Sequence, residues 1–179
     1  MQKHGEYQYL DLVREVLKDG IRKVDRGTDV VLYSLFGKQT RYDLSKGFPL
    51  LTTKRVYWKG VLHELYWFFK GDTNIKYLVD NNVHIWDDYP YKIYCGKFKS
   101  QNSNLKSQMS KEDFINKIAT DKKFAKKWGN LPRIYGEMWR SWPARSKRTI
   151  DQLKWVMQEM KDDPDAKNLI VTSWNPEYL

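Results

Sequence analysis

One carboxylate stands inside a strongly apolar stretch of the sequence, the nine residues VLHELYWFF from Val61 to Phe69. The spacing of the Leu, Tyr, Trp and Phe residues predicts a helix with a wide apolar face. A glutamate is almost never fully buried unless it is paired or takes part in chemistry. Glu64 therefore has two interpretations. It lies on the solvated side of this helix, or it is held among apolar side chains to transfer a proton.

The other patterns mix helices and strands in an irregular order. Residues 9–20 predict a helix that ends at Gly20, and residues 29–44 predict extended chain. A further helix is expected after a Thr149–Gln152 capping pair, and NLIVTSW (168–174) is predicted to be a buried strand. Because helices and strands do not alternate regularly, the sequence predicts an α+β or layered α/β domain, a sheet packed with helices, rather than a doubly wound fold.

Residues 89–131 differ in amino-acid composition from the rest of the chain. They are rich in lysine and predict short helices, one of them capped by Ser110 and another ending at Gly129. We interpret them as a small basic helical insertion. The main domain would then comprise residues 1–88 and 132–179.

Composition excludes several classes of protein. The 179 residues are 15% aromatic and 41% hydrophobic, too rich for a disordered chain. No apolar run reaches membrane-spanning length, and the N-terminus lacks the apolar segment of a secretory signal. A single cysteine, Cys95, cannot form an internal disulfide, which favours a reducing cytoplasm. The net charge of +10 leaves nucleic-acid binding open as a minor alternative.

Metal and glycine-loop nucleotide sites have no support in the sequence. The three histidines are scattered and there is one cysteine, so no metal is expected, and neither GxGxxG nor GxxxxGK[ST] occurs. The remaining candidates are Glu64, isolated arginines and aromatic-acidic clusters such as HIWDD (84–88). Together they suggest a pocket for a flat, anionic ligand.

Six sequence blocks carry a family resemblance. In order they are SKGFPLLTTKR, HELYWFFKGDTNIKYL, NNVHIWDD, IYGEMWRSWP, TIDQL and LIVTSWNPE. Their order and approximate spacing resemble those of thymidylate synthase. The resemblance implies reductive methylation of dUMP to dTMP, with 5,10-methylenetetrahydrofolate as donor of both carbon and hydride. It also implies that a cysteine thiolate adds to C6 of the uracil and makes C5 nucleophilic.

The resemblance assigns roles to individual residues. Glu64 matches the glutamate that handles protons at the pyrimidine with ordered water, and Tyr135 matches a tyrosine of that water network. Ile85 and Trp86 match positions against the folate, and Lys54 matches a lysine near its glutamyl tail.

The dUMP phosphate is assigned to two further positions. Arg26 matches a mobile-loop arginine that closes on it. Lys167 stands where the family carries the first of two adjacent arginines that reach the partner subunit's dUMP, and Asn168 replaces the second. Lysine lacks the bidentate fork of arginine and asparagine lacks the charge, so weaker phosphate binding is expected there.

The family's nucleophile lies in a Pro-Cys-His motif that follows the WNP block, whereas this sequence stops at Leu179. We therefore expect a truncated or split N-terminal part that is inactive alone and works as a homodimer or with a complementing C-terminal half. The alternatives are a divergent pyrimidine-nucleotide hydroxymethylase and a degenerate, non-catalytic homologue.

Overall fold

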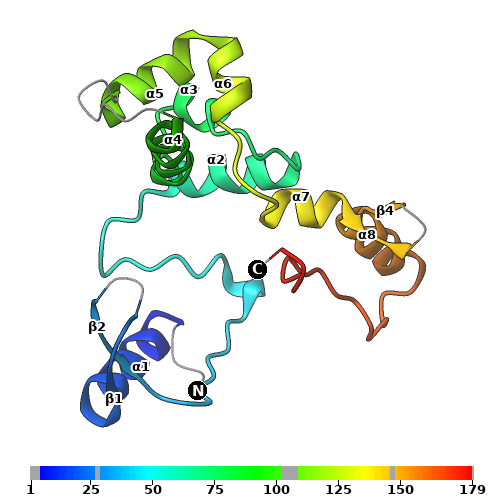
Figure 1. Cartoon of the computed structure of the whole chain (residues 1–179). Coiled ribbons are helices and arrows are strands. Elements are labelled where there is room, and N and C mark those ends of the chain that lie inside the picture. The colour runs from blue at the N-terminus through cyan, green and yellow to red at the C-terminus, as the bar shows by residue number, and fades with distance from the viewer. Residues whose placement is uncertain (1–4, 27–28, 102–108, 146–147, 179) are drawn as a thin grey trace. The chain divides into compact units, whose positions relative to one another are not determined.

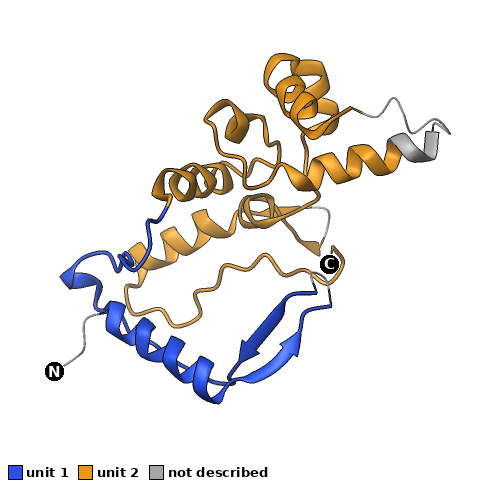
Figure 2. Ribbon diagram, turned by 90° about the vertical axis from the view of Figure 1, so that its left-hand side faces the viewer, with its two compact units in different colours: residues 1–56 blue, residues 57–179 orange. Residues whose placement is uncertain are grey.

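The structure, a computed structural model, describes residues 5–26, 29–101, 109–145 and 148–178. The chain divides into two compact units, residues 1–56 and residues 57–179 (Figure 2). Helices dominate, and the described strands form two separate two-stranded antiparallel sheets. This mixture confirms the α+β class. The separation of residues 89–131 as an insertion stays a prediction.

The first unit contains helix α1 (Gly5–Asp19), strands β1 (Ile21–Val24) and β2 (Val31–Ser34), and the short 3-10 helix η1 (Leu44–Lys46) (Figure 1). The predicted helix end at Gly20 is confirmed. A Cβ there would collide with the Val16 carbonyl oxygen, so only glycine allows this turn. The Glu6 carboxylate accepts hydrogen bonds from the Thr52 hydroxyl and the Thr53 amide (both 2.9 Å), which ties the loop before residue 56 to α1.

The second unit has its core among five helices. They are α2 (Trp58–Phe69), α3 (Lys76–Asp80), α4 (Asp88–Gln101), α5 (Lys111–Thr120) and α6 (Lys122–Trp128) (Figure 1). One continuous hydrophobic cluster joins Trp67 of α2 and Leu78 of α3 to Tyr94, Phe114 and Ile118 of the later helices. The lysine-rich helices are thus part of the same core as the helix that carries Glu64.

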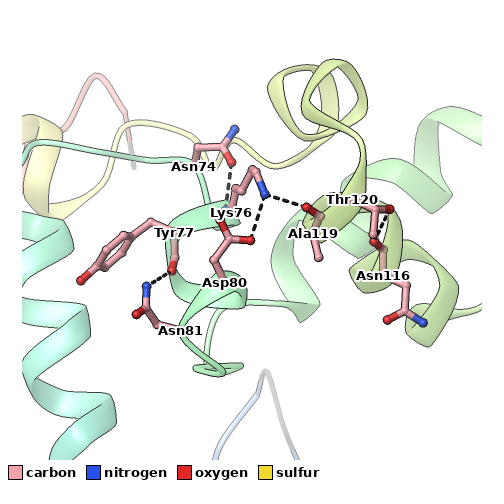
Figure 3. Close-up of polar contacts among 8 residues, drawn as sticks. All are labelled: Asn74, Lys76, Tyr77, Asp80, Asn81, Asn116, Ala119 and Thr120. Carbon is pink, nitrogen blue, oxygen red and sulfur yellow. Dashed lines mark hydrogen bonds and ion pairs between the residues drawn. The ribbon is translucent and has the colours of Figure 1, made fainter.

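A lysine joins α3 to α5 (Figure 3). Lys76 Nζ donates to Asp80 Oδ1 at 2.9 Å and to the Ala119 carbonyl at 2.7 Å. The backbone amide of Lys76 in turn donates to Asn74 Oδ1 at 3.0 Å. These contacts satisfy polar groups at the end of α5 and the start of α3, and they fix how the two helices pack.

Helix caps confirm part of the sequence reading and correct part of it. Ser110 caps α5 by accepting from the Asp113 amide, and Gly129 ends α6, both as predicted. The expected Thr149–Gln152 capping pair is wrong. Thr149 lies in β4 (Thr149–Ile150), which pairs with β3 (Trp142–Pro143), and Asp151 caps α8 (Gln152–Asp162). The acceptor is a carboxylate one residue before the helix.

The predicted buried strand at 168–174 is also wrong. These residues form no strand ladder, and Ile170 and Trp174 are exposed. The side-chain amide of the buried residue Gln152 lies beside this segment instead. Its Nε2 donates to the Thr172 carbonyl at 2.8 Å, and its Oε1 accepts from the Thr172 amide at 3.0 Å. A strand needs a second strand to pair with, and among the described residues none lies beside this one.

Helix α2 turns most of its large apolar side chains outward. Five of these exposed residues form what we call the α2 apolar face: Val61, Leu62, Leu65, Tyr66 and Phe69. With His63 and Tyr77, four members of this set line an open hollow of about 490 Å³. His63 Nδ1 and the Tyr77 hydroxyl, which belong to this lining, lie 2.9 Å apart. The opposite side of α2 carries the buried Gly60 and Trp67. A contiguous exposed apolar face of this kind is typical of a surface that binds another polypeptide.

Helix α7 (Tyr135–Arg140) approaches α2 closely because its second residue is Gly136 (Figure 1). A Cβ at Gly136 would lie 2.7 Å from both Cα and the carbonyl oxygen of Phe68. These are backbone atoms, which cannot swing away, so the approach requires glycine. It places Tyr135, the first residue of α7, beside the α2 helix.

We expect Gly136→Ala to lower the free energy of unfolding by about 1–3 kcal/mol, the usual cost of forcing an extra methyl into a packed contact. Denaturant unfolding followed by circular dichroism measures it. The matched control is Gly96→Ala in α4, where a Cβ meets nothing within 4 Å. There alanine should stabilise by up to about 1 kcal/mol because it favours the helix. Equal effects of the two substitutions would contradict the close approach.

Candidate active site

Glu64 is neither fully solvated nor fully buried, so its exposure lies between those of the two interpretations that the sequence allowed. It is half-buried in α2, and its Oε1 accepts a hydrogen bond from the indole Nε1 of Trp86 at 2.7 Å. A carboxylate that keeps one indole partner and part of its solvent exposure is held in a fixed orientation yet can still exchange a proton. The contact joins two motifs that are 22 residues apart in sequence.

The loop between α3 and α4 presents Trp86. Val83 is fully buried, and its amide donates to the Leu78 carbonyl at 2.9 Å, which anchors the start of the loop to α3. Asn82 has a positive φ of 58°, a conformation that asparagine adopts more readily than most residues. The chain then turns through residues 84–87 and enters α4 at Asp88. Trp86 is therefore held from both ends.

Aromatic rings surround the Glu64–Trp86 contact. The Trp86 ring lies 6.2 Å from that of Tyr135 and 6.3 Å from that of Phe68, and the Phe68 and Tyr135 rings lie 5.2 Å apart, centroid to centroid. Trp139 on the next turn of α7 packs edge-on against Phe68 at 5.6 Å. These tilted and edge-on contacts are favourable aromatic arrangements. A carboxylate beside such rings is suited to hold and protonate a flat heterocycle.

A histidine and a buried aspartate close the turn that carries Trp86. His84 Nδ1 lies 2.8 Å from Asp87 Oδ2, and His84 Nε2 lies 3.0 Å from Asn82 Oδ1. Asp87 is 1% exposed. Its burial raises the pKa of the carboxyl above the ordinary value, while the hydrogen bond and the charge of His84 act in the opposite direction. His84 thus stabilises the ionised form of a carboxylate that has little access to solvent.

The remaining predicted site residues are exposed. Ile85 is exposed next to Trp86, and Lys167 lies at an exposed bend after α8. Arg26 and Lys54 belong to the first unit, where Arg26 is exposed after β1 and Lys54 is exposed at a bend before α2. Of the predicted residues, the second unit brings Glu64, Trp86 and Tyr135 together. Their roles in binding stay predictions.

Two other sequence features have structural outcomes. Cys95, the single cysteine, lies within α4 and is half-buried. Within the described ranges, no three His, Cys, Asp or Glu side chains gather as a metal site, and no helix has both the length and the apolar character to cross a membrane.

Sequence reasoning assigned no individual role to three residues of this site. Phe68 forms part of the aromatic wall, Gly136 lets α7 approach it, and Asp87 underlies the turn of Trp86. Asp87 had a signal, because the motif HIWDD places two acids beside an aromatic residue. Phe68 and Gly136 had none, because an apolar residue and a glycine acquire their roles only from the neighbours that packing supplies.

A carboxylate and an indole among aromatic rings define a site of the kind that enzymes use for flat heterocycles. The sequence profile described as Thymidylate synthase matches residues 7–179. The thymidylate synthase of Mycoplasma genitalium is 48% identical over 172 residues, which are 96% of this chain and 56% of that protein. That of Phytoplasma mali is 48% identical over 171 residues (96% and 55%), and that of Mycoplasma pneumoniae 49% over 172 residues (96% and 56%).

The chain belongs to the thymidylate synthase family. It spans about half the length of the curated relatives it matches.

Proposed function

We propose that this chain is the part of a thymidylate synthase that carries Glu64 and the folate-facing aromatic residues. The reaction is the reductive methylation of dUMP to dTMP with 5,10-methylenetetrahydrofolate, in the cytoplasm and without a metal ion. The single observation that carries this proposal is the 2.7 Å hydrogen bond between Trp86 and Glu64, because it joins the residues that the family resemblance assigns to folate and to proton transfer.

Glu64 has the role of moving protons at the pyrimidine O4 and N3. The indole N–H of Trp86 holds one oxygen of the carboxylate, which leaves the other for water or substrate. Trp86, with Ile85 beside it, forms the wall against the folate ring, and Tyr135 completes the water network. The half-buried rings of Phe68 and Trp86 suit a flat heterocycle, because aromatic faces stack on such rings without needing a specific polar partner.

Exposed basic side chains bind the dUMP phosphate and the glutamyl tail of the folate. Arg26 and Lys54 of the first unit bind the dUMP phosphate and the folate glutamyl tail, respectively. Lys167 binds the phosphate of the partner's dUMP with a single charge, and Asn168 contributes none. We therefore expect this protein to depend more on Arg26 for phosphate than relatives that carry two arginines at 167 and 168.

The polypeptide partner is a second copy of the enzyme together with the part of the family sequence that the relatives have and this chain does not match. Two exposed apolar surfaces support this: the α2 apolar face, and Ile170, Val171 and Trp174 on the segment without a strand partner. A row of unpaired backbone groups beside apolar side chains favours pairing with another strand. Both surfaces belong to the second unit, which carries the candidate active site.

The test is a joined polypeptide, in which residues 1–179 are fused to the remaining C-terminal part of the Mycoplasma genitalium relative. We expect it to convert dUMP to dTMP with methylenetetrahydrofolate and to sediment as a dimer. The control is the same fusion with Trp86→Ala, which removes the indole from Glu64 and should lose most of the turnover. A folded, dimeric fusion with no turnover would contradict the proposal and favour a non-catalytic homologue. Methylation or hydroxymethylation of dCMP would favour the hydroxymethylase alternative.

A further inference from the structure

The hydrogen bond between His84 and Asp87 closes a four-residue turn around the two residues assigned to the folate. His84 and Asp87 are the first and last residues of the turn, and Ile85 and Trp86 are its two middle residues. A bond between the ends of a turn limits how far its middle residues can move. The orientation of the Trp86 indole is therefore coupled to a contact in which Glu64 takes no part.

Asp87 depends on His84 for its stability in this position. Its Oδ2 accepts from His84, whereas Oδ1 is buried and has no hydrogen-bond partner among the described residues. A buried carboxylate with one free oxygen is costly, so the remaining bond carries most of the compensation. Lys111 and Asp88 also act electrostatically on Asp87, and these two residues pair with each other at 2.6 Å. His84 is thus the hydrogen-bond partner that compensates the burial of the Asp87 side chain.

The second ring nitrogen of His84 extends the contact backwards along the chain. Nε2 lies 3.0 Å from Asn82 Oδ1, so one imidazole bridges the residue with positive φ before the turn and the buried acid at its end. The ring is about half exposed, and it is bound at both nitrogens. These two contacts hold the loop in one conformation. Because the ring is only half-buried, His84 can be substituted without opening the core.

We propose that His84 and Asp87 are positioning residues that hold the Trp86 indole on the Glu64 carboxylate. Loss of the His84–Asp87 bond frees the turn, the indole N–H leaves Oε1, and Glu64 loses its fixed orientation. The consequence for catalysis rests on the proposed function. The link between the turn and the indole does not depend on that function, because it is argued only from contacts within this chain.

The experiment measures the indole N–H of Trp86 by ¹H–¹⁵N NMR on the full 179-residue chain, with the signal assigned from Trp86→Phe. Glu64→Ala supplies the position of an unbound indole. His84→Phe keeps a planar ring without an N–H, and it should move the signal most of the way to that position. It should also speed exchange of the indole proton with water about tenfold, since a hydrogen bond to a charged group is lost. His84→Gln, which can still donate to Asp87, should leave the signal near its original position.

A matched control separates positioning from general destabilisation. Asp121→Ala removes the N-terminal cap of α6, so it lowers stability without touching the turn, and the indole signal should stay in place. The proposal is overturned if His84→Phe leaves the signal unchanged, if Asp121→Ala moves it equally, or if His84→Gln behaves like His84→Phe. Because no substrate is present, these outcomes do not depend on whether Glu64 takes part in catalysis.

Discussion

Glu64→Gln in the joined polypeptide should lower turnover of dUMP by about 100- to 10,000-fold, the usual range for loss of a general acid or base. Glutamine keeps the shape of the side chain and can still accept from the Trp86 indole, but it has no titratable proton. The Michaelis constant for dUMP should change much less, because the ground state needs no proton transfer. Steady-state kinetics with both substrates measures both quantities.

The control for this substitution is Glu112→Gln. Glu112 is an exposed acid in the first turn of α5, remote in sequence from the aromatic wall. It undergoes the same chemical change, so turnover should stay within about twofold of the parent, as is usual for an exposed surface residue. Normal turnover of Glu64→Gln together with a lower melting temperature would contradict the proposal. Glu64 would then serve only as the structural anchor of Trp86.

The 179-residue polypeptide by itself should show no conversion of dUMP. The family mechanism begins with a thiolate that adds to C6 of the uracil, and the sequence contains no Pro-Cys-His motif to supply one. Cys95 is a poor substitute because it lies half-buried within α4. A folate-dependent assay with excess purified chain measures this, and the joined polypeptide serves as the positive control.

Cys95→Ser decides what any residual turnover means. Turnover that persists in this variant would show that the reaction does not need a thiol of this chain, and it would overturn the expectation of inactivity. Turnover that disappears would identify Cys95 as the nucleophile, against the expectation that it has no catalytic role. The substitution removes a single sulfur atom from a helix position, so it should fold like the parent, which circular dichroism can check.

The local features of this fold could be read from the sequence because they depend on neighbouring residues. Gly20 ends α1 since a Cβ would collide with the carbonyl four residues before it, and Ser110 caps α5 by binding an amide three residues later. Such interactions involve one turn of the chain. The same logic failed at Thr149, where Asp151 supplied a competing cap two residues further on.

Features that need a distant partner could not be read. The composition of residues 168–174 favours a strand, but a ladder forms only where a second strand lies alongside, and among the described residues Gln152 takes that place with its side chain. The α2 apolar face likewise has the pattern of a buried surface, yet it is exposed because no described residue of the second unit covers it. Hydrophobic pattern states which side chains favour burial, and packing decides whether a partner is present.

The sequence by itself determined the family, the α+β class, and that an acid stands among apolar residues at position 64. Only the tertiary structure decided what that acid contacts. The Trp86 indole reaches Glu64 across 22 residues because Val83 anchors the loop to α3 and the His84–Asp87 bond closes the turn. Tyr135 joins them because Gly136 leaves room for α7 against Phe68. The reason is physical: a hydrogen bond or a ring contact depends on distance in space, and the linear order of residues does not specify that distance.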